Sequence, residues 1–260
     1  MSAAAGTHPS ALSTEALTVK VYPEVLEWHR SPHGHPLGFW IRTGTNDHNT
    51  VNASATEDEY HLRDLPPLSG WALDIGGYLG SVAIGLAADH PDLRVICIEP
   101  VPENAALIVR NVEVNRFSER IIVLHNATAA PGIDSTVVRY RYTGSELADH
   151  HAFVGNISLI EGTGATDIPH QETTIGCVSL SGLAATYGID RFALVKIDCE
   201  GCEWSALTDP AVALADIIVG EWHPTGGKTQ YDLRALLVPT HDLTFDGPLE
   251  GPQEFTAVRR

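Results

Sequence analysis

The sequence predicts an α/β protein whose helices cover both faces of a doubly wound, mostly parallel sheet closed by an antiparallel hairpin. Apolar, β-rich runs alternate with segments of helical periodicity, and one such run ends in a glycine turn that leads into a helix. Two β-rich segments near the C-terminus predict the closing hairpin. The 260 residues, 43% of them hydrophobic, can bury one large core. We therefore expect a single domain over residues 19–260 after a flexible arm, residues 1–18.

The central stretch of the chain is WALDIGGYLG, residues 71–80. Its apolar start predicts a buried strand over Trp71–Ile75, and the glycines that follow predict a tight turn. Residues Ser81–Ala88 predict a helix, which Pro91 ends because proline cannot continue the hydrogen-bond ladder. The exposed N–H groups and aligned dipoles at the start of such a helix favour the binding of a nucleotide-like ligand.

The spacing of this turn favours S-adenosylmethionine over a dinucleotide. A dinucleotide fingerprint is G-x-G-x-x-G, whereas this turn is D-x-G-G-x-x-G with the bulky Tyr78 in place of a middle glycine. An acid at Asp74 would repel a diphosphate but accept the ammonium of an amino-acid head group. We therefore assign Asp74, Gly76, Gly80 and Ser81 to donor binding, although an ordinary strand-to-helix turn is the simpler alternative.

Two polar residues at the ends of the next strands extend the expected donor site. Residues Arg94–Glu99 predict a strand whose last residue, Glu99, lies 25 residues after Asp74, near the spacing expected for a carboxylate on the ribose. Asn126 follows a short strand over Ile121–Leu124 and is placed to contact the adenine edge. A turn-forming role for Asn126 is an equal alternative.

The remaining elements follow in order. Residues 19–70 form a front segment expected over the cofactor loop, with a strand or short helix at Val19–Arg30, a strand at Phe39–Arg42, a polar turn over 43–48 and a helix near 57–62. Residues 143–173, polar and glycine-rich, are expected to form an acceptor-binding lid. The other expected helices are Pro102–Asn115, Ser181–Tyr187, Glu200–Leu207 and Tyr231–Leu237, and the other strands are Thr136–Tyr142, Thr174–Leu180, Phe192–Asp198, Asp216–Glu221, His241–Phe245 and Glu254–Val258.

Two carboxylates at strand ends suggest chemistry beyond donor binding. Asp198 and Glu221 each end a predicted core strand, where an open α/β sheet presents its ligands. Two such carboxylates suit Mg²⁺, which would orient and acidify an acceptor hydroxyl. His223 is the candidate base, with His150 and His151 as rivals. Structural roles remain open for all of them, and Glu200 and Glu203 are equally well explained as acids at a helix start.

Charge and composition limit the partners. Sixteen basic and thirty-three acidic residues give a net charge of −17, which disfavours nucleic acid and anionic membranes. No run of eighteen apolar residues predicts a membrane span, and the N-terminus lacks the features of a secretory signal. Four cysteines, of which only Cys199 and Cys202 have C-x-x-C spacing, are expected to be reduced. We therefore expect a cytoplasmic protein that acts on a small molecule, and leave a homodimer open.

Several motifs together resemble a known family. The segments DIGGYLGS, IEPVPEN, HNATAA, LVKIDCEGCEWSAL and GEWHP follow one another as in the FkbM family of S-adenosylmethionine-dependent methyltransferases. The earlier segments IRTGTNDHNTV and EDEY resemble that family's front block. The resemblance covers Trp40–Pro224, and K-I-D-x-E-G-x-E, residues Lys196–Glu203, is its most specific part.

The resemblance implies a Rossmann-like class I methyltransferase fold and methyl transfer from S-adenosylmethionine, usually to oxygen on sugars, polyketides or other secondary metabolites. Asp198 and Glu221 match, by position only, the metal carboxylates of magnesium-dependent sugar and catechol O-methyltransferases. Asn156 and Ser158 resemble a block that faces the acceptor. The resemblance places the donor on Asp74, Gly76, Gly80, Glu99 and Asn126, with Thr45, Asp47 and Tyr60 closing over it.

No motif identifies the acceptor. Our hypothesis is a saccharide hydroxyl, for example on an actinobacterial oligosaccharide such as a methylated mannoside. A polyketide or another secondary metabolite is the first alternative. An NAD(P)-dependent oxidoreductase on a similar sheet and a non-catalytic nucleoside-binding protein are alternatives of other classes, and Asp74 and Tyr78 argue against the oxidoreductase.

Overall fold

The computed structural model describes residues 22–140, 153–154, 171–246 and 253–260. The expected N-terminal arm and most of the expected lid lie outside these described residues. So do four residues considered above for the base or the acceptor contact: His150, His151, Asn156 and Ser158.

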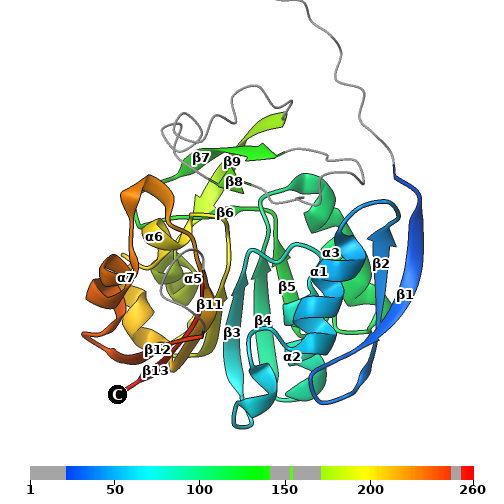
Figure 1. Ribbon diagram of the computed structural model, residues 1–260, viewed down its shortest axis with the longest axis horizontal. Coiled ribbons are helices and arrows are strands. Elements are labelled where there is room, and N and C mark those ends of the chain that lie inside the picture. The colour runs from blue at the N-terminus through cyan, green and yellow to red at the C-terminus, as the bar shows by residue number, and fades with distance from the viewer. Residues whose placement is uncertain (1–21, 141–152, 155–170, 247–252) are drawn as a thin grey trace, which may run out of the picture.

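A seven-stranded sheet forms the centre of the protein (Figure 1). In spatial order its strands are β12 (His241–Asp246), β13 (Gln253–Arg259), β11 (Ile217–Trp222), β10 (Phe192–Ile197), β3 (Gly70–Ile75), β4 (Leu93–Ile98) and β5 (Ile121–Leu124). The five strands from β11 to β5 pair in parallel, and β13 runs antiparallel to both β11 and β12. The predicted doubly wound sheet and its closing hairpin are confirmed.

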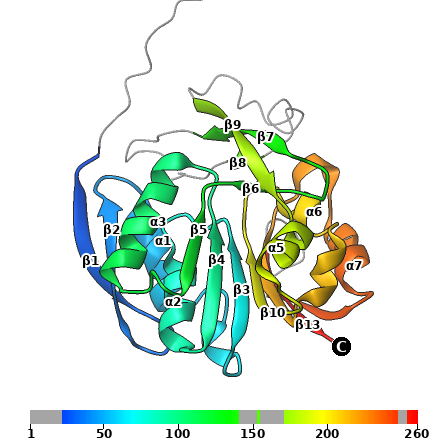
Figure 2. The same ribbon diagram turned by 180° about the vertical axis from the view of Figure 1, so that it is seen from behind.

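Helices cover both faces of this sheet because side chains alternate along each strand. On β3, Leu73 and Ile75 face one hydrophobic cluster, and Ala72 faces the other. The first cluster contains residues of α5 (Leu180–Tyr187) and α7 (Gln230–Leu237). The second contains residues of α2 (Ser81–Asp89), α3 (Pro102–Val114) and the front segment. Seen from behind, α2 and α3 lie on the same side as the front segment (Figure 2).

The front segment begins with a hairpin. Strands β1 (Glu24–Arg30) and β2 (Pro36–Arg42) pair antiparallel and lie beside α3. One side chain of α3 and one from the residue that follows it fix this arrangement: Asn111 Oδ1 accepts the N–H of Trp40 at 2.7 Å, and Asn115 Oδ1 accepts the N–H of Gly38 at 3.0 Å.

The prediction of a helix near residues 57–62 is wrong. Helix α1 (Asp47–Val51) continues as a π-helical turn over Asn52–Glu57, so the helix precedes the expected one. It ends at Asp58, whose φ of +61° is left-handed and whose carboxylate accepts the N–H groups of Leu62 and Arg63. Short 3₁₀ turns follow at Leu62–Asp64, and later at Pro210–Leu214 and Thr225–Gly227.

A second sheet lies at the end of the central sheet where β5 leads into β6 (Figures 1 and 2). Its strands, in spatial order, are β6 (Ala127–Thr128), β9 (Gln171–Val178), β7 (Ser135–Tyr140) and β8 (Phe153–Val154). The carboxyl ends of the parallel strands, where the site residues were expected, therefore face this second sheet. Among the described helices, none has both the length and the apolar character needed to cross a membrane.

Gly76 allows the loop after β3 to lie against the end of β10, which gives a first prediction. Its φ is +78°, and a Cβ on it would lie 1.8 Å from the carbonyl oxygen of Asp198. Because the backbone must move to relieve that clash, we expect Gly76→Ala to lower the free energy of unfolding by at least about 2 kcal/mol. Urea denaturation would measure the change.

Gly44→Ala is the matched control for this variant. Gly44 has a φ of +75°, but a Cβ there would meet nothing within 4 Å. We expect Gly44→Ala to lower the free energy of unfolding by only about 1 kcal/mol, which is the cost of a left-handed backbone at a residue other than glycine. Equal losses in the two variants would contradict the close approach of the loop to β10.

Candidate active site

Hydrogen bonds to the last residue of β4 and to the residue after it hold the loop between β3 and α2 in place. The N–H groups of Gly76 and Gly77 both donate to the carbonyl oxygen of Ile98, each at 3.0 Å. Tyr78 has a left-handed φ of +49°, and its N–H donates to Glu99 Oε2 at 2.8 Å. Gly80, with a φ of +81°, precedes the first turn of α2. The expected strand, glycine turn and helix are therefore present.

Glu99 lies at the end of β4, as expected, and is almost fully buried. Its carboxylate also accepts the N–H of Val101 at 2.9 Å and contacts Asn104 Nδ2 at 3.4 Å. Burial raises the pKa of Glu99 to about 7, although the backbone N–H bonds favour the charged form. The contact expected between Glu99 and the ribose hydroxyls stays a prediction.

The carboxylate of Asp74, which we expected to bind the ammonium of the donor, is already paired with the ammonium of Lys196. The carboxylate is fully buried, with Oδ1 3.4 Å from Nζ of Lys196 and Oδ2 accepting the N–H of Ala83 at 3.1 Å. Lys196 Nζ also donates to the carbonyl oxygen of Gly76 at 2.8 Å. Burial opposes the charge on Lys196, but Asp74, Asp198 and other carboxylates outweigh it and raise its pKa. The direct contact expected between Asp74 and a donor ammonium stays a prediction.

Ser81 and the front-segment residues support the loop from outside. Ser81 Oγ lies 2.6 Å from Ser54 Oγ, so this hydroxyl is already paired. Thr45 Oγ1 donates to the carbonyl oxygen of Arg42 and shapes the turn before α1. Asp47 is fully buried, accepts two side-chain bonds from Arg42 at 2.8 and 3.0 Å, and accepts the Tyr78 hydroxyl at 2.7 Å. Burial opposes ionisation of Asp47, but Arg42 and Tyr78 outweigh it and lower its pKa.

Asn126 connects the two sheets. Its Nδ2 donates to the carbonyl oxygen of Gly176 on β9 at 3.0 Å. A Cβ at Gly176 would lie 3.2 Å from that nitrogen, so the glycine allows the contact. The structural role that was left open for Asn126 is therefore present, and its contact with adenine stays a prediction.

Tyr60 connects the front segment to the strand-end carboxylates. Its hydroxyl donates to Asp198 Oδ2 at 2.6 Å, and Nζ of Lys196 lies 5.3 Å from the centre of its ring. Glu59, beside it, was not identified from the sequence. Burial raises the pKa of Glu59 to about 7, with Lys196 opposing and Asp198 adding to the shift.

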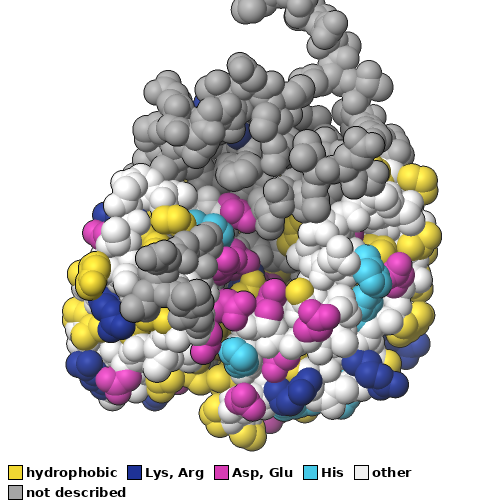
Figure 3. Space-filling view, in the orientation of Figure 1, with side chains coloured by type: hydrophobic (Ala, Val, Ile, Leu, Met, Phe, Trp, Pro, Cys, Tyr) yellow, Lys and Arg dark blue, Asp and Glu magenta, His cyan; other side chains and the backbone are white. Residues whose placement is uncertain are grey.

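A cluster of acids surrounds His223 at the ends of β10 and β11. One ligand atom each from Asp198, Glu200 and His223 lies within 4.8 Å of the others. Glu221 Oε2 is 3.8 Å from His223 Nε2, so the expected Glu221 lies beside this group. Burial and Asp198 raise the pKa of Glu221 to about 6. Acidic side chains gather across the middle of the face shown in Figure 3.

His223 is held as a charged imidazolium in this arrangement. Its Nδ1 lies 3.1 Å from Glu203 Oε1 and its Nε2 lies 3.4 Å from Glu200 Oε2. Burial lowers the pKa of His223, but the bond to Glu203 and the surrounding carboxylates outweigh it and raise the pKa to about 9. At neutral pH the imidazole already carries its proton, so the expected role of His223 as a base is unfavourable and Glu221 has the better matched pKa.

Glu203 is a positioning residue, a role that the sequence analysis did not assign to it because it considered Glu203 only as an acid at a helix start. It is fully buried, and its carboxylate accepts the N–H of Gly201 at 2.8 Å and the N–H of His223 at 2.7 Å. It therefore ties the loop after β10 to the end of β11. The available signal was the E-G-x-E sequence that begins two residues after the strand-end Asp198 and places two acids within five residues of it.

The expectation that all four cysteines are reduced is wrong. Cys199 and Cys202 form a disulfide, whereas Cys97 and Cys177 are free. Glu200 and Gly201 have left-handed φ values of +55° and +107°, which curl the chain and bring the two Cα atoms to 5.4 Å. Because the chain is not helical at these two residues, α6 begins only at Glu203 and covers Glu203–Ala206, which is shorter than the helix expected over Glu200–Leu207. The cysteine content therefore gives no support for a reducing compartment.

Comparison with known proteins agrees with this geometry. A sequence profile described as the Methyltransferase FkbM domain matches residues 74–246. The chain belongs to the FkbM methyltransferase family. As a member it is an S-adenosylmethionine-dependent methyltransferase, and the order of its sheet is that of the Rossmann-like class I methyltransferase fold. The family resemblance and fold class predicted from the sequence are confirmed.

Among curated proteins, this FkbM-family chain is similar to methyltransferase sdnD of Sordaria araneosa, with 22% identity over 78% of this chain and 85% of the relative. Similar solved structures include a precorrin-6y C5,15-methyltransferase of Geobacter metallireducens, at 14% identity and a TM-score of 0.44 over 85% of this chain and 92% of that one. TrmK of M. capricolum, in complex with S-adenosyl-homocysteine, has 10% identity and a TM-score of 0.41 over 82% and 67%.

The charge on His223 gives a pH prediction. Its pKa rises from 6.5 to about 9 on folding, so the folded protein holds this proton more tightly than the unfolded chain. The resulting stabilisation is complete below about pH 6.5 and is lost as the pH rises through about 9. We expect the free energy of unfolding to fall over this window by about 3 kcal/mol at most, as measured by urea denaturation.

Two variants test the assignment of this pH dependence. His223→Gln should flatten the decrease, whereas His35→Gln, at a histidine whose side chain is 57% exposed, should leave it unchanged. Glu203→Gln should lower the pKa of His223 itself, measured by NMR titration, because it removes the bonded carboxylate. The same profile in the His223→Gln variant and the unsubstituted protein would contradict the assignment.

Proposed function

We propose that this methyltransferase acts on oxygen and that its acceptor is a hydroxyl of a small molecule, with a saccharide favoured. One observation carries the proposal: the acid cluster around Asp198 lies directly beside the donor loop, which is our name for residues Gly76–Gly80 between β3 and α2. Gly76 packs against the carbonyl of Asp198, and Tyr60 from the front segment donates to its side chain. An acceptor hydroxyl held by these carboxylates would therefore lie close to a donor bound at Gly76 and Glu99.

In the proposed reaction the acceptor oxygen attacks the methyl carbon of S-adenosylmethionine. A carbon–oxygen bond forms while the carbon–sulfur bond breaks, which gives the methyl ether and S-adenosylhomocysteine. The hydroxyl proton passes to a carboxylate, and Glu221 is the best candidate because its pKa of about 6 lies near neutrality. The charged His223 would hold the negative charges of the cluster in place rather than accept the proton.

A divalent ion belongs to the proposal as a separate part. Asp198, Glu200 and His223 could hold one, with two carboxylates and one imidazole nitrogen, if the ion displaces the proton that His223 otherwise carries. This mixed donor set fits Mn²⁺ or Zn²⁺ as well as the Mg²⁺ suggested by the Asp198 and Glu221 pair alone. When bound, the ion would polarise the acceptor hydroxyl. Loss of turnover with EDTA would support it, and undiminished turnover would remove the ion while leaving the methyl transfer.

Other acceptors remain alternatives. A polyketide hydroxyl would use the same carboxylates, and an alkylamine acceptor would also have to lose a proton before attack because it is an ammonium at neutral pH. The net charge of −17 favours a neutral or cationic small molecule over an anionic one and over nucleic acid. Product analysis after turnover with a labelled methyl donor, on sugars first, would identify the atom that is methylated.

The donor assignment predicts the effect of Glu99→Gln. This isosteric change replaces the carboxylate oxygens that would accept the ribose hydroxyls by an amide with one acceptor, so we expect S-adenosylhomocysteine to bind at least about 10-fold more weakly. Glu113→Gln, at an exposed site of α3, is the control. A thermal-melt titration would compare the three proteins, with NAD and NADP as test ligands. Equal affinity in all three would remove Glu99 from the donor site.

The acceptor assignment predicts a different result for Asp198→Asn. An amide cannot hold the acceptor hydroxyl as a carboxylate does, so we expect turnover to fall at least about 100-fold while S-adenosylhomocysteine binding is kept. Asp242→Asn, at an aspartate whose side chain is 74% exposed, should be fully active. Full turnover of Asp198→Asn would exclude this cluster as the reaction centre.

A further inference from the structure

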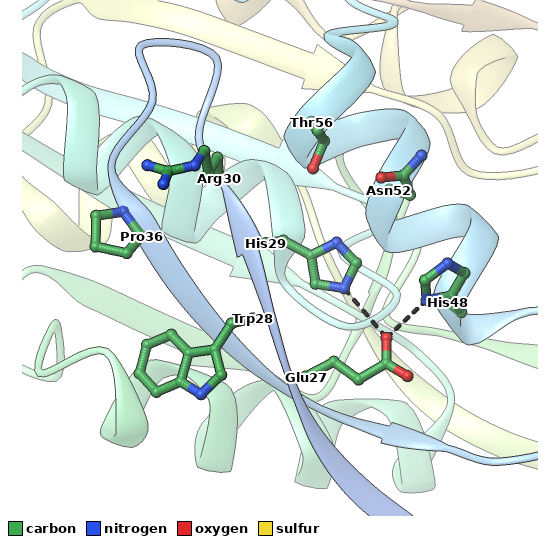
Figure 4. A pocket seen from close by; sticks show the side chains of 8 residues that line it. All are labelled: Glu27, Trp28, His29, Arg30, Pro36, His48, Asn52 and Thr56. Atoms are coloured by element: carbon green, nitrogen blue, oxygen red, sulfur yellow. Dashed lines mark hydrogen bonds and ion pairs between the residues drawn. The ribbon is translucent and has the colours of Figure 1, made fainter.

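A second group of possible metal ligands lies in the front segment, away from the donor loop. Glu27 and His29 are two residues apart on β1, so both side chains point to the same face of the strand. His48 projects toward them from α1 (Figure 4). Glu27 Oε2 lies 3.4 Å from His29 Nε2 and 2.6 Å from His48 Nδ1, and all three ligand atoms lie within 4.8 Å of one another.

His29 has a buried nitrogen that the described residues satisfy poorly. Its side chain is only 5% exposed, and the one described polar contact of Nε2 is Glu27 Oε2 at 3.4 Å, which is long for a hydrogen bond. A buried nitrogen with so weak a contact is unfavourable, which indicates that a ligand belongs there. Burial lowers the pKa of His29 although Glu27 opposes this, so the imidazole is neutral and its nitrogen can coordinate a cation.

The geometry suits a small transition-metal ion. Tetrahedral Zn²⁺ holds nitrogen and oxygen ligands at about 2.0–2.2 Å, which places the ligand atoms about 3.4 Å apart. The distance between Glu27 and His29 already has this value. The shorter distance to His48 would have to widen, which is easy because the His48 side chain is 58% exposed. Asn52 and Thr56 line the same cavity of about 390 Å³, which leaves room for a water as the fourth ligand.

We propose that Glu27, His29 and His48 form a binding site for a divalent transition-metal ion of the zinc class. The ion would join β1 to α1 and so fix the front segment. His48 directly follows Asp47, which accepts the hydroxyl of Tyr78 from the donor loop. The site is separate from the proposed methyl transfer and does not depend on it.

A Co²⁺ titration of the full chain, followed by visible absorption, tests this site. Glu27→Gln and His48→Gln should each lose one equivalent of tightly bound ion, with an affinity at that site at least about 100-fold lower. Two variants serve as controls, Glu200→Gln and His61→Gln. Each removes one possible ligand from one of the two other clusters of histidine and carboxylate side chains among the described residues. Both should keep the equivalent that the first two variants lose.

A second measurement distinguishes the loss of metal binding in a variant from a defect in its folding. Without metal, His48→Gln should melt like the unsubstituted protein because His48 is on the surface. Zn²⁺ should raise the melting temperature of the unsubstituted protein and of Glu200→Gln by clearly more than that of His48→Gln, and EDTA should reverse the shift. The proposal is overturned if all four variants titrate alike, or if the tight equivalent is lost only from Glu200→Gln or His61→Gln.

Discussion

The buried ammonium of Lys196 is the constraint on which the rest of the site depends. A lysine inside the core is stable only if carboxylates and carbonyl oxygens surround it, and here Asp74 and the carbonyl of Gly76 do so. These contacts bind the end of β10 to the end of β3. The donor loop, the strand-end Asp198 and the Tyr60 ring are therefore fixed around one charge, and a substitution at Lys196 would disturb all of them together.

The acid cluster is organised by one buried residue rather than by its exposed members. Glu203 receives two backbone N–H groups and the imidazole of His223, and so fixes the loop after β10 against the end of β11. The disulfide between Cys199 and Cys202 closes the same loop. This arrangement concentrates negative charge at the ends of β10 and β11, beside the loop after β3, while the positive charge on His223 limits the repulsion among the carboxylates.

The front segment gives the donor loop its second support. Asp47 joins Arg42 to the Tyr78 hydroxyl, and Tyr60 reaches Asp198, so one short segment contacts both halves of the proposed site. The residues that resemble the family's front block therefore contact Tyr78 and Asp198 in this structure. The proposed metal site would stiffen the same segment from its outer side, through His48.

The sequence alone determined the strand, glycine turn and helix around Gly76, the five parallel strands, the closing hairpin and the family, because these depend on local patterns and on motif order. It also placed Glu99, Asp198, Glu221 and His223 at strand ends. Only the tertiary structure decided which groups these residues meet: Lys196 for Asp74, three carboxylates for His223, and one disulfide. Pairing, burial and pKa depend on neighbours far apart in the chain, and periodicity and spacing carry no information about those distances.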